Sequence, residues 1–168
     1  MDPNARRLVE RFDLEPHPEG GYFREVYRSD LQLPHPLIPE DQARKRCAGT
    51  LIYFLLEGAS FSAFHRVRWS DKGWHLYAGG PVSLHIIAPN GQHSTSLLSS
   101  NFDEGEPTAV VPAGHWQAAA LTAGSSWAFG GCTVSPGFEF ADFQMPPATE
   151  LTELFPQHAD LIGRLTRS

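Results

Sequence analysis

Four of the eight histidines lie on or beside predicted strands, and they are the side chains best suited to chemistry: His65, His75, His85 and His115. Neutral imidazoles that converge inside a barrel can bind a transition metal or act as general bases near neutral pH. The alternative for each is a core histidine whose hydrogen bonds are satisfied. The other four fall in turns or tails and are interpreted as surface residues: His17, His35, His93 and His158.

Spacing and strand parity group some of these side chains. His65 and His75 are ten residues apart on segments joined by a tight connection, so they can lie side by side across a hairpin. Residues two apart on a strand face the same side, which pairs His75 with Tyr77 and His115 with Gln117. Parity leaves open which face is interior. Polar groups on otherwise apolar strands are typical of a small-molecule pocket.

Length and composition set the class of protein. The 168 residues, 41% hydrophobic and 19% charged, predict one globular domain spanning residues 1–168. A net charge of −6 argues against a nucleic-acid partner, which needs a basic surface. The longest apolar runs, such as 51–56, are far short of the roughly 20 residues of a membrane span. Two cysteines and the absence of a signal-peptide pattern indicate a cytoplasmic location.

The elements that must position these residues are mainly short strands. We expect a helix at 5–12 capped by Asn4, a strand at 22–28, and a long surface loop at 30–46. The N-terminal helix and strand thus occupy residues 4–29, a barrel core spans about 48–136, and helices fill 148–166. Gly, Pro and Asn turns about every ten residues separate the core strands, as in a sandwich or barrel. The expected strands are 50–57, 60–68, 73–78, 82–88, 93–98, 109–111, 116–121 and 126–134, with Asn90-Gly91 as a hairpin turn.

Seven sequence blocks, in order, resemble one known family. They are His17–Tyr22, Arg24–Ser29, Ile52–Leu56, Phe64–Arg66, Trp74–Gly79, Val111–Ala118 and Gly131–Phe138. The chain resembles the "cupin 5" family of RmlC-like cupins over residues 8–165. The resemblance implies an all-β fold, the double-stranded β-helix or cupin jelly roll, with short N- and C-terminal helices. It also implies a homodimer and a ligand pocket inside the barrel.

The metal motif of the wider cupin superfamily is incomplete in this sequence. Where the motif has its second and its last histidine, this chain has Val67 and Gln117. Lys72 stands where relatives of the resembled family usually carry a glutamate, and Asp71 lies at the counted distance from His65. A partial site for a divalent transition metal would consist of His65, Asp71 and His75, with His115 beside them and water in the open positions. The alternative is a metal-free pocket in which the same residues bind a substrate.

Three functions follow from this reading. The leading hypothesis is a cupin that binds a small polar or carbohydrate-like metabolite and epimerises or isomerises it. His65, His75 and Tyr77 would then be the catalytic residues, and His115, Gln117 and His85 would contact the substrate. The second is a metal-dependent oxygenase or lyase, and the third a non-catalytic binding module.

The sequence also supports predictions for a glycine pair, a cysteine and three aromatic residues. Gly20-Gly21 is interpreted as a turn entering a strand, because no Lys or helix follows as in a phosphate loop. Cys132 is expected to be an inert core residue. The aromatic residues Tyr22, Phe23 and Tyr27 are expected to pack in the strand or to form a dimer interface.

Overall fold

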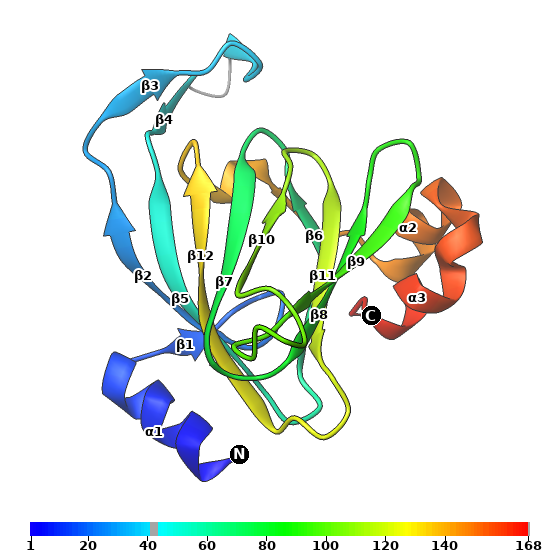
Figure 1. Ribbon diagram of the computed structural model, residues 1–168. Coiled ribbons are helices and arrows are strands. Elements are labelled where there is room, and N and C mark those ends of the chain that lie inside the picture. Colours follow the sequence, from blue (N-terminus) through cyan, green and yellow to red (C-terminus); the bar gives the residue numbers. More distant parts are fainter. Residues whose placement is uncertain (41–43, 168) are drawn as a thin grey trace.

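A computed structural model describes residues 1–40 and 44–167 of the chain. Two antiparallel sheets face each other, and short helices cover part of their outer faces (Figure 1). The elements are α1 Pro3–Phe12, β1 Glu15–Pro16, β2 Tyr22–Arg28, β3 Gln32–Pro34, β4 Lys45–Cys47, β5 Thr50–Glu57, β6 Phe61–Val67, β7 Asp71–Gly79, β8 Val82–Ile87, β9 His93–Leu98, β10 Thr108–Val111, β11 Trp116–Leu121, β12 Trp127–Ser135, η2 Phe140–Asp142, β13 Phe143–Gln144, α2 Ala148–Leu154, η3 Pro156–His158 and α3 Ala159–Arg164.

One sheet has the strand order β1-β2-β5-β12-β7-β10 and the other the order β13-β6-β11-β8-β9. Consecutive strands therefore alternate between sheets at several points, as in a jelly roll, and the predicted all-β fold is confirmed. The sequence expectation for β6 and β7 is wrong in one respect. They do not form a hairpin, because β6 pairs with β11 and β13 while β7 pairs with β10 and β12.

Apolar residues separate into three clusters that account for the layers. Between the sheets lie Phe54, Leu56, Trp74, Leu84 and Val111 with their neighbours. The outer face of the five-stranded sheet packs against α2 and α3 through residues that include Phe64, Ile87, Trp116, Leu151 and Ile162. The helix α1 packs on the outer face of the other sheet through Ala5, Leu14, Leu55 and Phe129. Alternation along each strand therefore separates barrel-facing from outward-facing side chains.

Local elements differ from the sequence expectation in two places. Asp2, not Asn4, caps α1, since its carboxylate accepts the Asn4 backbone N–H at 2.8 Å and Pro3 begins the helix. The region predicted as a loop at 30–46 contains β3 and β4, paired antiparallel, and includes the buried Ile38 and Arg46. Residues 41–43 of that predicted loop lie outside the described residues.

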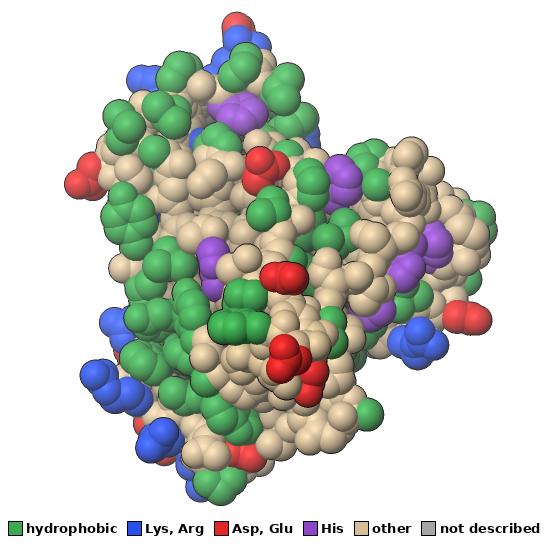
Figure 2. Space-filling model, in the orientation of Figure 1, with side chains coloured by type: hydrophobic (Ala, Val, Ile, Leu, Met, Phe, Trp, Pro, Cys, Tyr) green, Lys and Arg blue, Asp and Glu red, His purple; other side chains and the backbone are tan. Residues whose placement is uncertain are grey.

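The Asn90-Gly91 turn joins β8 to β9 as predicted, with Gly91 at a φ of 84°. Figure 2 shows apolar side chains on the surface over the β3–β4 arm and the six-stranded sheet, and histidines on the side where β9 and α3 lie. Across the described residues, no helix has both the length and the apolar character that crossing a membrane requires.

Candidate functional site

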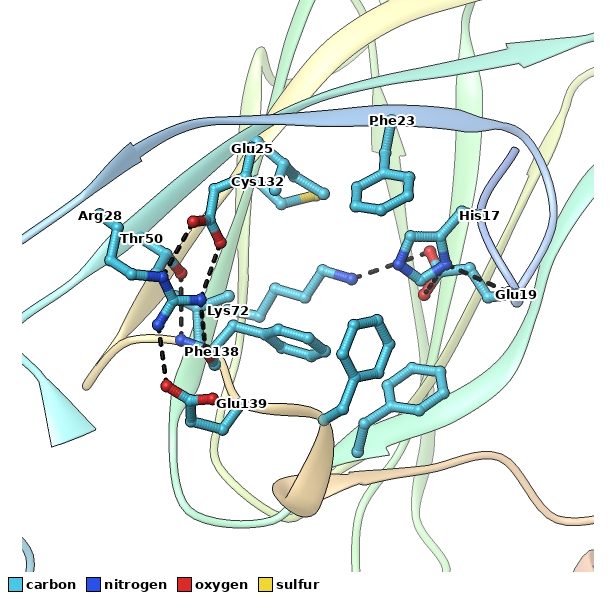
Figure 3. A pocket seen from close by; sticks show the side chains of 14 residues that line it. His17, Glu19, Phe23, Glu25, Arg28, Thr50, Lys72, Cys132, Phe138 and Glu139 are labelled. Carbon is cyan, nitrogen blue, oxygen red and sulfur yellow. Dashed lines mark hydrogen bonds and ion pairs between the residues drawn. The ribbon is translucent and has the colours of Figure 1, made fainter. Parts of the chain in front are cut away.

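A pocket of about 90 Å³ opens between the two sheets beside the segment that contains η2 and β13 (Figure 3). Its walls are mostly aromatic and aliphatic, and polar groups occupy two ends. The lining residues are His17, Glu19, Phe23, Glu25, Arg28, Thr50, Ile52, Lys72, Cys132, Val134, Phe138, Glu139, Phe140 and Phe143. An apolar cavity with a few converging polar side chains is the usual form of a small-molecule site. We call His17, Glu19 and Lys72 the pocket floor, and Glu25, Arg28 and Glu139 the pocket mouth.

The turn between β1 and β2 brings two of the floor residues into the barrel. Gly20 and Gly21 adopt φ values of 108° and 72°, which L-residues with a side chain rarely adopt. A Cβ at Gly21 would lie 2.5 Å from the Leu55 carbonyl oxygen. Such a tight turn directs Glu19 inward, where it is 2% exposed. The interpretation of these glycines as a strand-entry turn is confirmed.

Glu19 is the centre of a buried polar network. Its carboxylate accepts the Ser62 hydroxyl at 2.8 Å and lies 3.2 Å from His65 Nε2. The Lys72 ammonium lies 3.1 Å from the same His65 nitrogen and 3.9 Å from a Glu19 oxygen. His65 is fully buried and Lys72 nearly so. Burial of opposite charges in contact satisfies the usual requirement for buried ions.

The hydrogen bonds of His65 define its protonation. Its Nδ1 lies 2.8 Å from the Ala63 carbonyl oxygen, so Nδ1 carries the proton and Nε2 is left to accept from Lys72. Burial lowers the pKa of His65 to about 4, with Glu19 opposing and Lys72 adding to that effect. Burial raises the pKa of Glu19, but His65, Lys72 and His17 outweigh it and lower the value to about 2. At neutral pH the network therefore consists of a carboxylate, a neutral imidazole and an ammonium ion.

His17 is the second imidazole of the floor, and its interpretation as a surface residue is wrong. Its side chain is 6% exposed, and its Nδ1 accepts the Glu19 backbone N–H at 3.1 Å. The same Nδ1 lies 3.6 Å from a Glu19 carboxylate oxygen. Burial is the main cause that lowers the pKa of His17, so the ring is neutral at pH 7. No hydrogen bond from a described residue engages Nε2, on the other side of the ring.

The hydrogen bond from the Glu19 N–H to Nδ1 places the ring proton on Nε2, which can donate to a ligand in the pocket. For Nε2 to accept a proton instead, Nδ1 must give up that hydrogen bond and carry a proton directed at the Glu19 carboxylate oxygen 3.6 Å away. The imidazolium that forms would then be stabilised by Glu19, as a carboxylate stabilises a catalytic histidine in general.

Neighbouring aromatic and amide groups hold Lys72 in place. Its ammonium lies 4.9 Å from the centre of the Trp74 ring, and the Trp74 indole N–H donates to Gln117 at 2.7 Å. Lys72 and Trp74 are two apart on β7 and both point into the barrel, so the strand period explains their proximity. The buried Gln117 serves to fix the indole.

The pocket mouth is a cluster of exposed charges. Arg28 donates to both oxygens of Glu25 at 2.8 and 2.9 Å, to Glu139 at 2.9 Å and to the Phe138 carbonyl at 3.0 Å. These bonds connect β2 to the segment that closes the pocket (Figure 3). The buried Arg46 anchors the same segment through two bonds of 2.7 Å to Asp142.

The structure does not bring together the residues that the sequence grouped. His65 points into the barrel, whereas His75 is on the outward face of β7 and bonds Thr133 at 2.9 Å. Asp71 and Tyr77 share that outward face, with Asp71 bonded to the Ala113 N–H. The expected metal set of His65, Asp71 and His75 is therefore not assembled, because alternate residues of β7 face opposite sides.

The predicted substrate contacts are also dispersed. Gln117 lies inside the barrel next to His65 in the strand register, although it does not line the pocket. His115 directly precedes β11, with its Nδ1 3.3 Å from the Ala113 carbonyl oxygen. His85 points outward from β8, toward α3. Cys132 lines the pocket, but burial raises the pKa of its thiol to about 12, in keeping with an unreactive residue.

Sequence reasoning missed Glu19 and Lys72 as functional residues and set His17 aside. Two features of the sequence could have indicated them. Glu19 is a charged residue in a tight turn between Pro18 and Gly20, and Lys72 lies two residues from Trp74, on the same face of the strand. A carboxylate in so constrained a turn must point in a fixed direction, and an interior strand position is costly for an unpaired lysine.

Comparison with known proteins identifies the family. Residues 6–146 match the family model described as Cupin_5, Cupin superfamily (DUF985). The chain belongs to this cupin family. It is similar to the structure of a hypothetical protein from Leishmania major, with 32% identity, a TM-score of 0.88, and coverage of 98% of this chain and 99% of that one.

Two further relatives belong to other organisms. Protein SO0799 from Shewanella oneidensis is 33% identical, with a TM-score of 0.84 and 97% of both chains covered. The uncharacterized protein YML079W of Saccharomyces cerevisiae is 29% identical over 149 residues, which cover 83% of this chain and 73% of the yeast protein.

The cupin fold raises the question of a metal inside the barrel, and the residues around His65 do not fit one. The Nε2 lone pair of His65 accepts from Lys72, whose ammonium also lies 3.9 Å from a Glu19 oxygen. Across residues 1–40 and 44–167, no three His, Cys, Asp or Glu side chains gather as a metal site would require. Lys72 supplies the positive charge at this point of the barrel of this cupin.

Proposed function

We propose that this cupin binds a small, uncharged, carbohydrate-like metabolite in the aromatic pocket and isomerises or epimerises it by proton transfer. One observation supports the proposal most strongly. The pocket floor presents a neutral imidazole backed by a carboxylate, His17 with Glu19, beside the Lys72 ammonium. A base and a cation at one end of an apolar pocket are the two groups that proton abstraction next to a carbonyl needs.

The volume of the pocket and the charges that line it favour a small, uncharged ligand. A cavity of about 90 Å³ has room for roughly six to nine water-sized groups. Its lining carries two cations, Arg28 and Lys72, against three carboxylates, so it offers no excess positive charge to a phosphate. Aromatic walls suit the C–H face of a small sugar, and the floor provides polar partners for its oxygens.

The residues perform the reaction in a balanced sequence. With its own proton moved to Nδ1, His17 Nε2 takes a proton from the carbon next to the carbonyl, and the C–H electron pair forms an enolate. Lys72 donates a hydrogen bond to the enolate oxygen, and Glu19 stabilises the imidazolium. For epimerisation, the enolate turns in the pocket and His17 returns the proton to the opposite face of the same carbon. For isomerisation, the neighbouring hydroxyl proton moves to the enolate oxygen, and His17 returns its proton to the former carbonyl carbon while the new carbonyl forms at the carbon that lost its proton. No oxidant or other reactant is consumed.

His65 is a positioning residue in this proposal. It has no exposed surface and does not line the pocket, but its Nε2 holds the Lys72 ammonium in place. The leading hypothesis from the sequence thus keeps its reaction class, while the base moves from His65 and His75 to His17. The two thiols, Cys47 and Cys132, are buried and unbridged, which supports a reducing, cytoplasmic location as part of the proposal.

The test follows hydrogen exchange at carbon. Dihydroxyacetone, a small uncharged hydroxyketone, is incubated with the protein in D₂O, and loss of the C–H signal is measured by NMR. The wild type should accelerate exchange over buffer. His17→Gln should slow it roughly 100-fold or more, the ordinary contribution of a general base. Lys72→Met should slow it by a similar factor because the enolate loses its cation.

His75→Gln is the matched control, since His75 faces away from the pocket and should leave exchange unchanged. Equal loss in His75→Gln and His17→Gln would contradict the assignment. A wild type that binds the ketone and exchanges no faster than buffer would make the site a binding module. Absence of binding to this and to other uncharged three- to six-carbon sugars would overturn the ligand class.

A further inference from the structure

A second group of histidines lies outside the barrel, on the hairpin formed by β8 and β9. His85 on β8 and His93 on β9 are diagonal neighbours, since His85 pairs with Thr95 and His93 pairs with Ile87. Leu84 and Ile86 point into the core, so His85 faces the opposite side, toward α3. Figure 2 shows histidine side chains gathered on this side of the molecule.

Two ring nitrogens converge at this place. His85 Nδ1 and His93 Nε2 are 3.2 Å apart, with the rings stacked at a centroid distance of 5.4 Å. The Thr95 hydroxyl lies 3.3 Å from the first nitrogen and 3.4 Å from the second. With metal–nitrogen bonds of about 2.0–2.1 Å, that separation corresponds to an angle of about 100° at a shared ion, close to tetrahedral.

Both rings are neutral in the range where metals bind. Burial is the main cause that lowers the pKa of each, reinforced for His85 by His93 and Arg164 and for His93 by His158. In the free protein, one ring must donate its proton to the other across the 3.2 Å contact. A metal ion needs a lone pair from both His85 Nδ1 and His93 Nε2. Binding therefore requires only that the proton between the two rings moves to the other nitrogen of the ring that carries it.

We propose that His85 Nδ1 and His93 Nε2 bind a divalent transition-metal ion of the zinc class at the edge of the groove beside α3. The groove has a volume of about 510 Å³, which leaves space for water to complete the coordination. Arg164 and Asp160 also line it, with opposite charges. His158 packs near His93 at 5.4 Å, and its Nε2 is engaged by the Gly91 carbonyl. The site is a pair of protein ligands, and it does not depend on the function proposed for the barrel.

Titration of the untagged full chain with ZnCl₂ by calorimetry at pH 7.5 tests the proposal. The wild type should bind one zinc ion, and His85→Gln and His93→Gln should each weaken binding at least tenfold. His115→Gln, a partly exposed histidine elsewhere on the sheet, is the control and should bind as the wild type does. Arg164→Gln should strengthen binding several-fold, because it removes a positive charge beside the ion.

Circular dichroism melting establishes that each variant is folded, and His93 lies on the last strand of its sheet, where a glutamine is tolerated most easily. A wild type that does not bind zinc below about millimolar concentration overturns the proposal. Binding that survives both histidine substitutions, or that is lost equally in His115→Gln, overturns it as well. Binding that is lost in His65→Gln would place the ion in the barrel and contradict this location.

Discussion

At the scale of residues, the buried network makes stability depend on acidity in a defined direction. His65 is held neutral by burial, with its pKa near 4 against an ordinary 6.5. Below pH 6.5 the unfolded chain therefore takes up a proton that the folded chain refuses until about pH 4. The free energy of unfolding therefore decreases as the pH is lowered from 6.5 to 4, by about 3 kcal/mol for a pKa shift of this size. Urea unfolding at several pH values between 7 and 4 measures this slope.

The substitution His65→Gln should flatten that slope, and His75→Gln, outside the network, should leave it unchanged. Glu19 acts in a lower window, since its pKa is lowered from 4.5 to about 2. Its contribution is fully present above pH 4.5 and disappears toward pH 2, so a loss of stability should persist in His65→Gln at the most acidic values. An unaltered slope between pH 6.5 and 4 in His65→Gln would contradict the neutral state assigned to this ring.

Residue types alone could indicate part of this site. The sequence placed His65 on a predicted core strand but left open whether its side chain faces the interior, and the structure buries it completely. It could not select His17, since a turn between two prolines is ordinarily exposed and only tertiary contacts bury it. Lys72 was noticed only as a departure from a metal motif. Its role depends on Glu19, which is 53 positions away in the chain.

At the scale of elements, the turn that carries His17 and Glu19 depends on two glycines. Gly21→Ala would force a side chain into a left-handed conformation and against the Leu55 carbonyl. We expect a loss of about 2–4 kcal/mol from strain and the close contact together, and weaker ligand binding because both floor residues move. Gly58→Ala is the matched control. Its φ is 58°, but no atom lies within 4 Å of the added Cβ, so only the conformational cost of about 1 kcal/mol applies.

Urea unfolding of the two variants gives the comparison. Equal losses would show that crowding at Leu55 does not matter and that the turn can relax.

The element pattern was largely predictable, but its pairing was not. Strand 50–57 and strand 116–121 have the predicted limits, since apolar runs between Gly, Pro and charged residues delimit strands well. The partner of each strand depends on where the chain crosses between sheets. The turn after Val67 is such a crossing, so β6 and β7 separate although they are consecutive. The expectation of a hairpin between these two strands is the reason why His75 was predicted to lie beside His65.

At the scale of the whole molecule, one edge of the six-stranded sheet is incompletely covered. β1 pairs only with Tyr22 and Phe23, so in the described residues the remainder of β2 has no strand on that side. Val26 and Tyr27 are 40% and 56% exposed there, and Leu31 follows at 61%. Unpaired strand edges with exposed apolar side chains are sites where another strand adds. We propose that a second copy of this chain pairs along β2, which gives the homodimer expected from the sequence a definite location.

The dimer can be tested by light scattering coupled to size exclusion at about 10–100 μM protein. The wild type should have twice the mass of the chain, and the double change Val26→Asp with Tyr27→Asp should produce a monomer, because two buried carboxylates at the pairing edge cost several kcal/mol. Phe102→Asp is the control, since Phe102 is 78% exposed on a loop away from β2 and should leave the dimer intact. Phe23 and Arg28 of the pocket lie on the same strand, so pairing along β2 would stiffen the pocket mouth. The monomeric double variant should therefore bind the pocket ligand more weakly while keeping its zinc affinity, and a monomeric wild type would contradict the interface altogether.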